Sequence, residues 1–209
     1  MIVDPRRLRL CLVTDRNLSR GRPLTEIVAA AIRGGATMVQ LREKDADTRA
    51  FVEAARALKT MLVEVGVAFI VNDRVDVALA VDADGVHVGQ SDMRVEDVRR
   101  LLGPDRIVGL SIDGVDQIRH ADAECADYFG VGPIHAQSTK ADAAPPLGVA
   151  GLRAARALTT KPIVAIGGIT PENAAAALAA GAQGLAVVSA IVAADDPEAA
   201  TRRFARMLG

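Results

Sequence analysis

The chain has 209 residues, of which 50% are hydrophobic and 2% aromatic, with no tryptophan. This length predicts one domain over residues 1–209, and its core must be built from alanine, valine, isoleucine and leucine. The formal net charge of −1 gives no general attraction to nucleic acid or to an anionic membrane, so neither is an expected partner. The scarcity of aromatic rings also argues against stacking on bases.

The two cysteines and the N-terminal segment give no sign of secretion. Cys11 and Cys125 each lie in a short apolar run, which favours buried structural thiols over catalytic thiols or a disulfide. Residues 1–9 are charged and lack the apolar centre of a signal peptide, and no apolar stretch approaches the ~20 residues of a membrane span. We therefore expect a cytoplasmic protein.

Short β-type runs alternate with longer helical segments along the whole chain, which is typical of βα units around a parallel sheet. The predicted strands cover residues 8–14, 37–42, 68–71, 85–88, 107–111, 128–131, 162–166 and 184–188. About eight such units close a barrel. The alternative, an open doubly wound sheet, calls for a glycine-rich turn after the first strand, but residues 14–18 contain no glycine. The pattern favours a single (β/α)8 TIM barrel.

Three helices have recognisable ends. Apolar residues at helical spacing between positions 51 and 62 predict one that closes at Gly66. A second is predicted to begin with Thr170 as N-cap and Pro171 at its first position, and to end at Gly181. The last is expected to begin at Pro197 and to run to the C-terminus.

The residues after the second strand suit an anionic group. In a TIM barrel the residues that follow the strands form the active face. Alternation along an extended segment turns Gln40, Arg42 and Lys44 to one side, where two cations and a neutral donor would bind a phosphate or diphosphate. The alternative is a solvated strand end in which Arg42 pairs with Glu43.

Carboxylates follow the third and fourth strands. Asp73 and Asp92 come from neighbouring strands, and such a pair can hold one Mg²⁺ ion because hard oxygen ligands suit this ion. The alternative is that each aspartate caps the helix after it. His87, inside the fourth strand, is expected to be packed or structural rather than catalytic.

The residues at the ends of the fifth and sixth strands add hydroxyl groups and a cation. Ser111 ends the fifth strand and either contacts a ligand or caps a helix. The segment after the sixth strand offers Ser138, Thr139 and Lys140 to an anionic group, or is simply a surface loop.

Glycines after the seventh strand and residues 187–190 after the eighth have the pattern of a barrel phosphate site, in which backbone amides meet the positive end of a short helix. The chain therefore offers two separate anion sites.

Taken in order, these segments resemble the thiamine phosphate synthase family over nearly the whole chain. The matching segments are residues 39–44, 71–74, 85–90 with Asp92, 130–133 with Thr139 and Lys140, 167–169, and 187–190. Several separated motifs in one register are more specific than any one of them. The resemblance implies a transferase that joins hydroxymethylpyrimidine diphosphate to thiazole phosphate, giving thiamine phosphate and diphosphate.

The resemblance also assigns residue roles. The implied contacts of the pyrimidine diphosphate are Gln40, Leu41, Arg42, Glu43, Lys44, Asn72, Ser111 and Lys140. The implied Mg²⁺ ligands are Asp73 and Asp92, and the thiazole phosphate would be held by Gln137, Ser138, Thr139, Gly168, Val188 and Ser189. The predicted catalytic residues are Arg42, Lys44, Ser111 and Lys140.

Three positions depart from the family pattern: His135 replaces the usual aromatic residue, Gln137 a threonine, and Asp113 a histidine. His135 keeps open a thiazole tautomerase, a related barrel that performs proton transfer. A non-catalytic binder of phosphorylated thiazole or pyrimidine is the third hypothesis. The sequence leaves the oligomeric state open and is compatible with a homo-oligomer.

Overall fold

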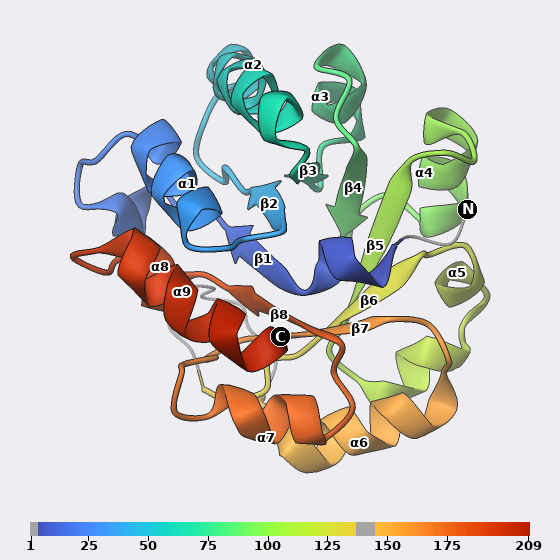
Figure 1. The fold of residues 1–209 in the computed structure, drawn as a ribbon. Coiled ribbons are helices and arrows are strands. Elements are labelled where there is room, and N and C mark those ends of the chain that lie inside the picture. The colour runs from blue at the N-terminus through green and yellow to red at the C-terminus, as the bar shows by residue number, and fades with distance from the viewer. Residues whose placement is uncertain (1–3, 137–144) are drawn as a thin grey trace.

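The structure is a computed structural model that describes residues 4–136 and 145–209. Eight parallel strands form a closed barrel in sequence order, with β8 paired to β1 (Figure 1). The predicted (β/α)8 barrel is confirmed, with each strand inside or within one residue of its predicted range. The strands are β1 (Leu10–Val13), β2 (Met38–Leu41), β3 (Ala68–Asn72), β4 (Gly85–Val88), β5 (Ile107–Ile112), β6 (Tyr128–Val131), β7 (Ile163–Ile166) and β8 (Gly184–Val187).

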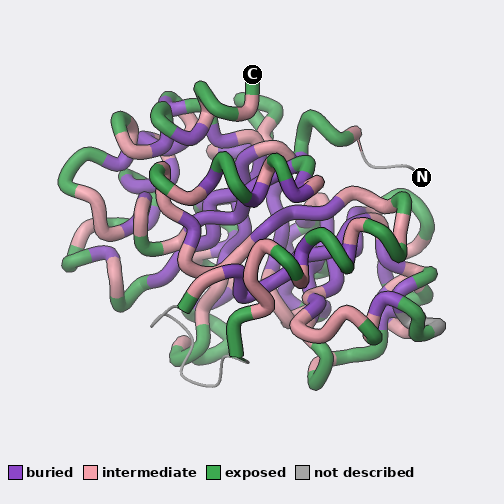
Figure 2. The backbone as a smooth tube through the Cα atoms, turned by 90° about the horizontal axis from the view of Figure 1, so that it is seen from below, coloured by how far each residue is buried: buried purple, intermediate pink, exposed green. Residues whose placement is uncertain are grey.

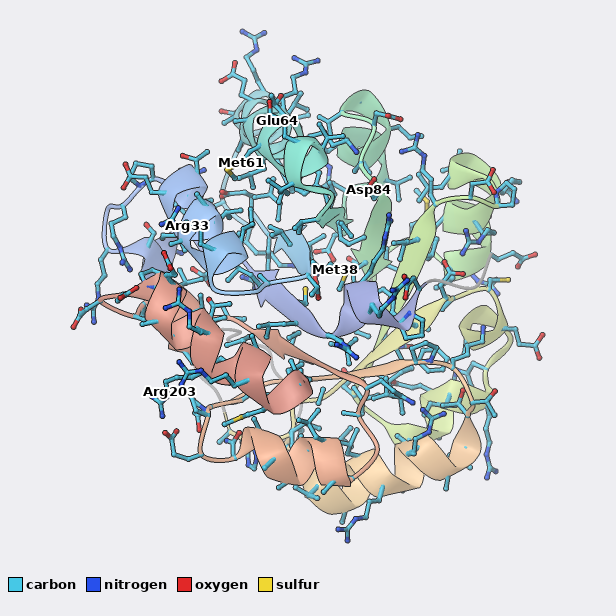
Figure 3. The ribbon with its side chains drawn as sticks, viewed as in Figure 1. Arg33, Met38, Met61, Glu64, Asp84 and Arg203 are labelled. Atoms are coloured by element: carbon cyan, nitrogen blue, oxygen red, sulfur yellow. The ribbon has the colours of Figure 1, made fainter. Side chains whose placement is uncertain are left out.

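Helices surround the barrel (Figure 1). They are α1 (Leu24–Arg33), α2 (Thr48–Val65), α3 (Val75–Ala80), α4 (Val95–Leu102), α5 (Ala121–Glu124), α6 (Gly148–Leu158), α7 (Ala174–Ala179), α8 (Ser189–Val192) and α9 (Pro197–Leu208), with 3₁₀ turns η1 (Pro5–Leu8), η2 (Asn17–Ser19) and η3 (Val115–Arg119). The last helix, α9, packs against α1, where Arg33 Nε donates to Glu198 at 2.8 Å. In Figure 3 Arg33 and Arg203 mark the outer surface, whereas Met38 lies near the barrel centre. None of the described helices has the length and apolar character needed to cross a membrane.

The strands are buried on both faces, as the purple segments at the centre of Figure 2 show. Along β1, Leu10 and Leu12 belong to the apolar layer between strands and helices, whereas Cys11 and Val13 belong to the cluster inside the barrel. Side chains of a strand alternate between its faces, so one short run supplies both layers. Burial raises the pKa of the Cys11 thiol to about 12, as expected for a structural thiol.

The predicted helix boundaries at Gly66 and Pro197 are confirmed, and Gly181 directly follows the C-cap of α7, Ala180. Gly66 closes α2 in the left-handed region at φ 69°, and α9 begins at Pro197. The predicted start at Pro171 is wrong, because α7 begins at Ala174. The Thr170 amide donates to Asn173 Oδ1 at 2.9 Å, and the Thr170 carbonyl accepts from the Asn173 amide at 3.2 Å. These bonds close residues 171–173 into a separate turn before the helix.

Candidate active site

Amide side chains from β2 and β3 meet at the rim where the strands end. Gln40 Nε2 donates to Asn72 Oδ1 at 2.7 Å, and Gln40 is almost fully buried. All eight strands are parallel, so the residues after them share this rim. The structure therefore brings together two of the residues expected to contact the pyrimidine diphosphate.

The two predicted cations that follow β2, Arg42 and Lys44, also lie at this rim, each beside a carboxylate. Lys44 Nζ lies 2.9 Å from Asp73 Oδ2, and Arg42 Nη1 lies 3.5 Å from Asp15 Oδ2. Both cations line a pocket of about 150 Å³ between the segments that follow β1 and β2. A cation held beside a pocket is available to an anion with little reorganisation.

The neighbours of Arg42 in sequence make other contacts. The predicted alternative of an Arg42–Glu43 pair is wrong: Glu43 pairs with Arg16 at 2.7 Å, and its side chain is 3% exposed. The Leu41 side chain is fully buried in the layer between strands and helices. Because side chains alternate, Leu41 and Glu43 offer a ligand at this rim mainly their backbone.

Asp73 and Asp92 form an acidic pair. Burial raises the pKa of Asp73, the neighbouring Asp92 carboxyl raises it further, and Lys44 opposes both effects. Carboxylates held together repel each other when ionised, and a divalent cation bound by their oxygens relieves that repulsion. The chemistry of the pair thus fits Mg²⁺, although no group of three or more His, Cys, Asp or Glu residues gathers as a metal site within 4–136 and 145–209.

The alternative role of these aspartates as helix caps is wrong. The N-cap positions of α3 and α4 are Arg74 and Arg94, and neither helix has a side-chain cap. Asp73 instead has a left-handed backbone at φ 62°, and Asp92 Oδ2 accepts from the Gly89 amide at 2.7 Å. Each carboxylate is therefore held by a loop that follows a strand, at the rim.

Ser111 is the rim end of a buried polar chain. Its Oγ lies 2.9 Å from His87 Nε2, and His87 Nδ1 lies 2.9 Å from Tyr128 Oη. Burial lowers the pKa of His87 to about 4, so the ring is neutral at pH 7. The expectation of a packed His87 is confirmed, because the residue is buried.

The ends of β7 and β8 provide a second part of the rim. Gly168 has φ 63°, and a Cβ there would lie 2.7 Å from the Ala136 carbonyl oxygen, so this turn requires glycine. Asn173 Nδ2 donates to the Gly168 carbonyl at 2.8 Å and fixes the turn. Val188 and Ser189 begin the short helix α8, whose first amides lack partners within the helix.

Residues 137–144 lie outside the described residues, and they include four predicted site residues: Gln137, Ser138, Thr139 and Lys140. The segment before them is described. The His135 amide donates to the Gly167 carbonyl at 3.0 Å, and His135 Nε2 is buried without a hydrogen-bond partner among the residues described.

Comparison with known proteins decides the family. Residues 10–191 match the family described as thiamine monophosphate synthase. The thiamine-phosphate synthase of Chloroflexus aurantiacus is 56% identical over 196 residues, which cover 94% of this chain and 90% of that protein. The chain belongs to the thiamine monophosphate synthase family. The thiamine-phosphate synthase of Moorella thermoacetica is 50% identical over 195 residues, covering 93% of each chain.

Solved structures agree with this family assignment. The thiamine phosphate pyrophosphorylase from Pyrococcus furiosus has a TM-score of 0.88 and 38% sequence identity, covering 98% of this chain and 96% of that one. A 3-hexulose-6-phosphate synthase has a TM-score of 0.69 at 17% identity and shares the fold alone.

Asp15 and Arg16, which the sequence analysis did not single out, also lie at the rim. Asp15 is buried and lies beside Arg42, and Arg16 pairs with Glu43 across the pocket. Both lie within three residues of the end of β1, and this position could have identified them. Asp113, which departs from the family pattern, faces the turn into η3, where Gln117 Nε2 donates to its Oδ1 at 2.5 Å.

Proposed function

We propose that this chain is a transferase that joins hydroxymethylpyrimidine diphosphate to thiazole phosphate, releasing diphosphate and forming thiamine phosphate. The observation that carries the proposal is the meeting of cations, amides and an acidic pair after β2, β3 and β4. Lys44 touches Asp73, and Gln40 touches Asn72. Membership of the thiamine monophosphate synthase family supports the same reaction.

The chemistry requires no protein nucleophile. The bond between the pyrimidine methylene carbon and the diphosphate oxygen breaks, and the leaving diphosphate takes the electron pair. The lone pair of the thiazole nitrogen then forms the new carbon–nitrogen bond. Arg42, Lys44 and Lys140 would stabilise the negative charge that develops on the diphosphate, by preorganised electrostatics.

Asp73 and Asp92 would hold Mg²⁺ through their carboxylate oxygens. When bound, this ion supplies Lewis-acid stabilisation of charge on the phosphate oxygens. Lys44, which pairs with Asp73 at 2.9 Å, would then be released toward the diphosphate. Gln40, Asn72 and Ser111 would orient the pyrimidine, with the backbone of residues 41 and 43 completing the contacts.

The thiazole phosphate would bind at the ends of β7 and β8. The tight turn at Gly168 and the first amides of α8, at Val188 and Ser189, are suited to a phosphate group. Residues 137–139 are proposed to complete this contact. A single cytoplasmic domain over residues 1–209 stays a prediction.

Incubating the protein with both substrates and Mg²⁺ tests the proposal. We expect diphosphate and thiamine phosphate in equal amounts, measured by coupled phosphate release and by chromatography. Folded protein that gives no product would contradict it. Thiazole isomerisation without Mg²⁺ that is lost in His135→Ala would indicate the tautomerase instead, and calorimetric binding of both ligands without product would indicate a binder.

A further inference from the structure

A chain of hydrogen-bonding groups runs from the barrel interior to the rim. Tyr128 on β6 is 1% exposed and His87 on β4 is 7% exposed. Two contacts of 2.9 Å join Tyr128 Oη to His87 Nδ1 and His87 Nε2 to Ser111 Oγ. We propose that His87 and Tyr128 are positioning residues that fix the Ser111 hydroxyl as a donor to the pyrimidine substrate.

Two strand glycines make room for this chain. Gly109 on β5 is paired in register with both His87 and Tyr128. A Cβ on Gly109 would lie 2.4 Å from His87 Nδ1 and 2.4 Å from Tyr128 Cζ, and one on Gly130 would lie 2.9 Å from His87 Cε1. Neither glycine has a positive φ, so the requirement here is space rather than backbone conformation.

The contacts select one tautomer of His87. The buried Tyr128 O–H needs an acceptor, and among residues 4–136 and 145–209 the Nδ1 atom of His87 is the one that lies within hydrogen-bonding distance. Tyr128 therefore donates to Nδ1, which must be unprotonated. In a neutral imidazole the hydrogen then lies on Nε2, which donates to Ser111 Oγ.

This direction of donation determines what Ser111 can offer a ligand. Its oxygen accepts from His87, so its own hydrogen is free to point to another acceptor. The pyrimidine diphosphate carries such acceptors in its ring nitrogens and phosphate oxygens. This role rests on the proposed function, because it assumes that the substrate binds at the rim beside Ser111.

A double-mutant cycle with a direct observation of the tautomer tests the inference. Tyr128→Phe removes the donor and keeps the ring, and Ser111→Ala removes the end of the chain. We expect Tyr128→Phe to lower kcat/KM for the pyrimidine diphosphate by about three- to tenfold in the wild-type background. It should have no effect in the Ser111→Ala background, and KM for thiazole phosphate should not change. The same loss in both backgrounds would overturn the inference.

Long-range ¹H–¹⁵N NMR of the histidine rings gives a readout that does not need turnover. The wild type should show the hydrogen of His87 on Nε2, and Tyr128→Phe should reduce that preference. A hydrogen on Nδ1 in the wild type would overturn the inference. Val164→Ala is the matched control, because it thins the same interior cluster without removing a hydrogen bond. It should lower the free energy of unfolding and leave the tautomer unchanged.

The experiments distinguish failure of the proposed function from failure of the positioning role. If the wild type forms no thiamine phosphate, the proposed function fails while the NMR result still decides the direction of the hydrogen bonds. If the wild type is active and the cycle is additive, the reaction stands and the positioning role of His87 and Tyr128 is wrong.

Discussion

Acid should destabilise this protein through His87, and the effect can be calculated. Burial lowers the pKa of His87 from 6.5 to about 4 in the folded state. As the pH falls below 6.5, the unfolded chain takes up the proton first, so the free energy of unfolding decreases. The loss occurs between pH 6.5 and 4 and is complete below that. It amounts to about 1.4 kcal/mol at pH 5.5 and roughly 3 kcal/mol in full.

Urea unfolding followed by circular dichroism at pH 7.5 and 5.5 measures this loss. His87→Gln keeps hydrogen-bonding groups but does not titrate. Its free energy of unfolding should therefore fall between pH 7.5 and 5.5 by about 1.4 kcal/mol less than that of the wild type. Carboxylates such as Asp73 contribute equally to the pH dependence of the free energy of unfolding in both proteins, so their contribution cancels in the difference. His120→Gln, which removes an exposed histidine, is the control and should follow the wild type. Identical losses in the wild type and His87→Gln would refute the reasoning.

Three further predictions concern residues of the proposed site. Asp73→Asn and Asp92→Asn should each lower kcat by roughly 100-fold or more, with a smaller effect on the free energy of unfolding, because a lost Mg²⁺ ligand affects mainly charge stabilisation. Equal losses of activity and stability would mark both residues as structural. Lys140→Ala should reduce kcat in steady-state assays, and unaltered kinetics would remove it from the mechanism. Gly168→Ala should lower the free energy of unfolding by about 2 kcal/mol, since φ is 63° and the new Cβ meets the Ala136 carbonyl; an unchanged urea midpoint would show that the turn can relax.

The barrel could be predicted because its signals are local. Strands buried on both faces appear as short continuous apolar runs, and the segments between them have helical spacing. The start of α7 could not be predicted in the same way. Thr170 and Pro171 have the residue types of a helix start, but the Asn173 side chain bonds back to the Thr170 amide and delays the helix.

Much of the rim could also be predicted, because residues directly after parallel strands share one edge. Gln40 and Asn72, and Lys44 and Asp73, are in contact as this rule requires. What could not be predicted is which side chains from different strands pair with one another. The Asp15–Arg42 pair and the contact of His87 with Tyr128 depend on strand register and side-chain direction, which no local pattern specifies.

The pairing of β1 with β8 has a consequence for how the chain must fold. The first strand meets its second neighbour only when residues 184–187 are available, so closing the barrel joins the two strands that are most distant in sequence. Before that moment, during synthesis on the ribosome, β1 exposes an unpaired edge that could join another nascent chain. Contacts of such long sequence separation slow folding. A truncation that removes β8 would leave two open edges and should yield aggregates rather than a smaller barrel.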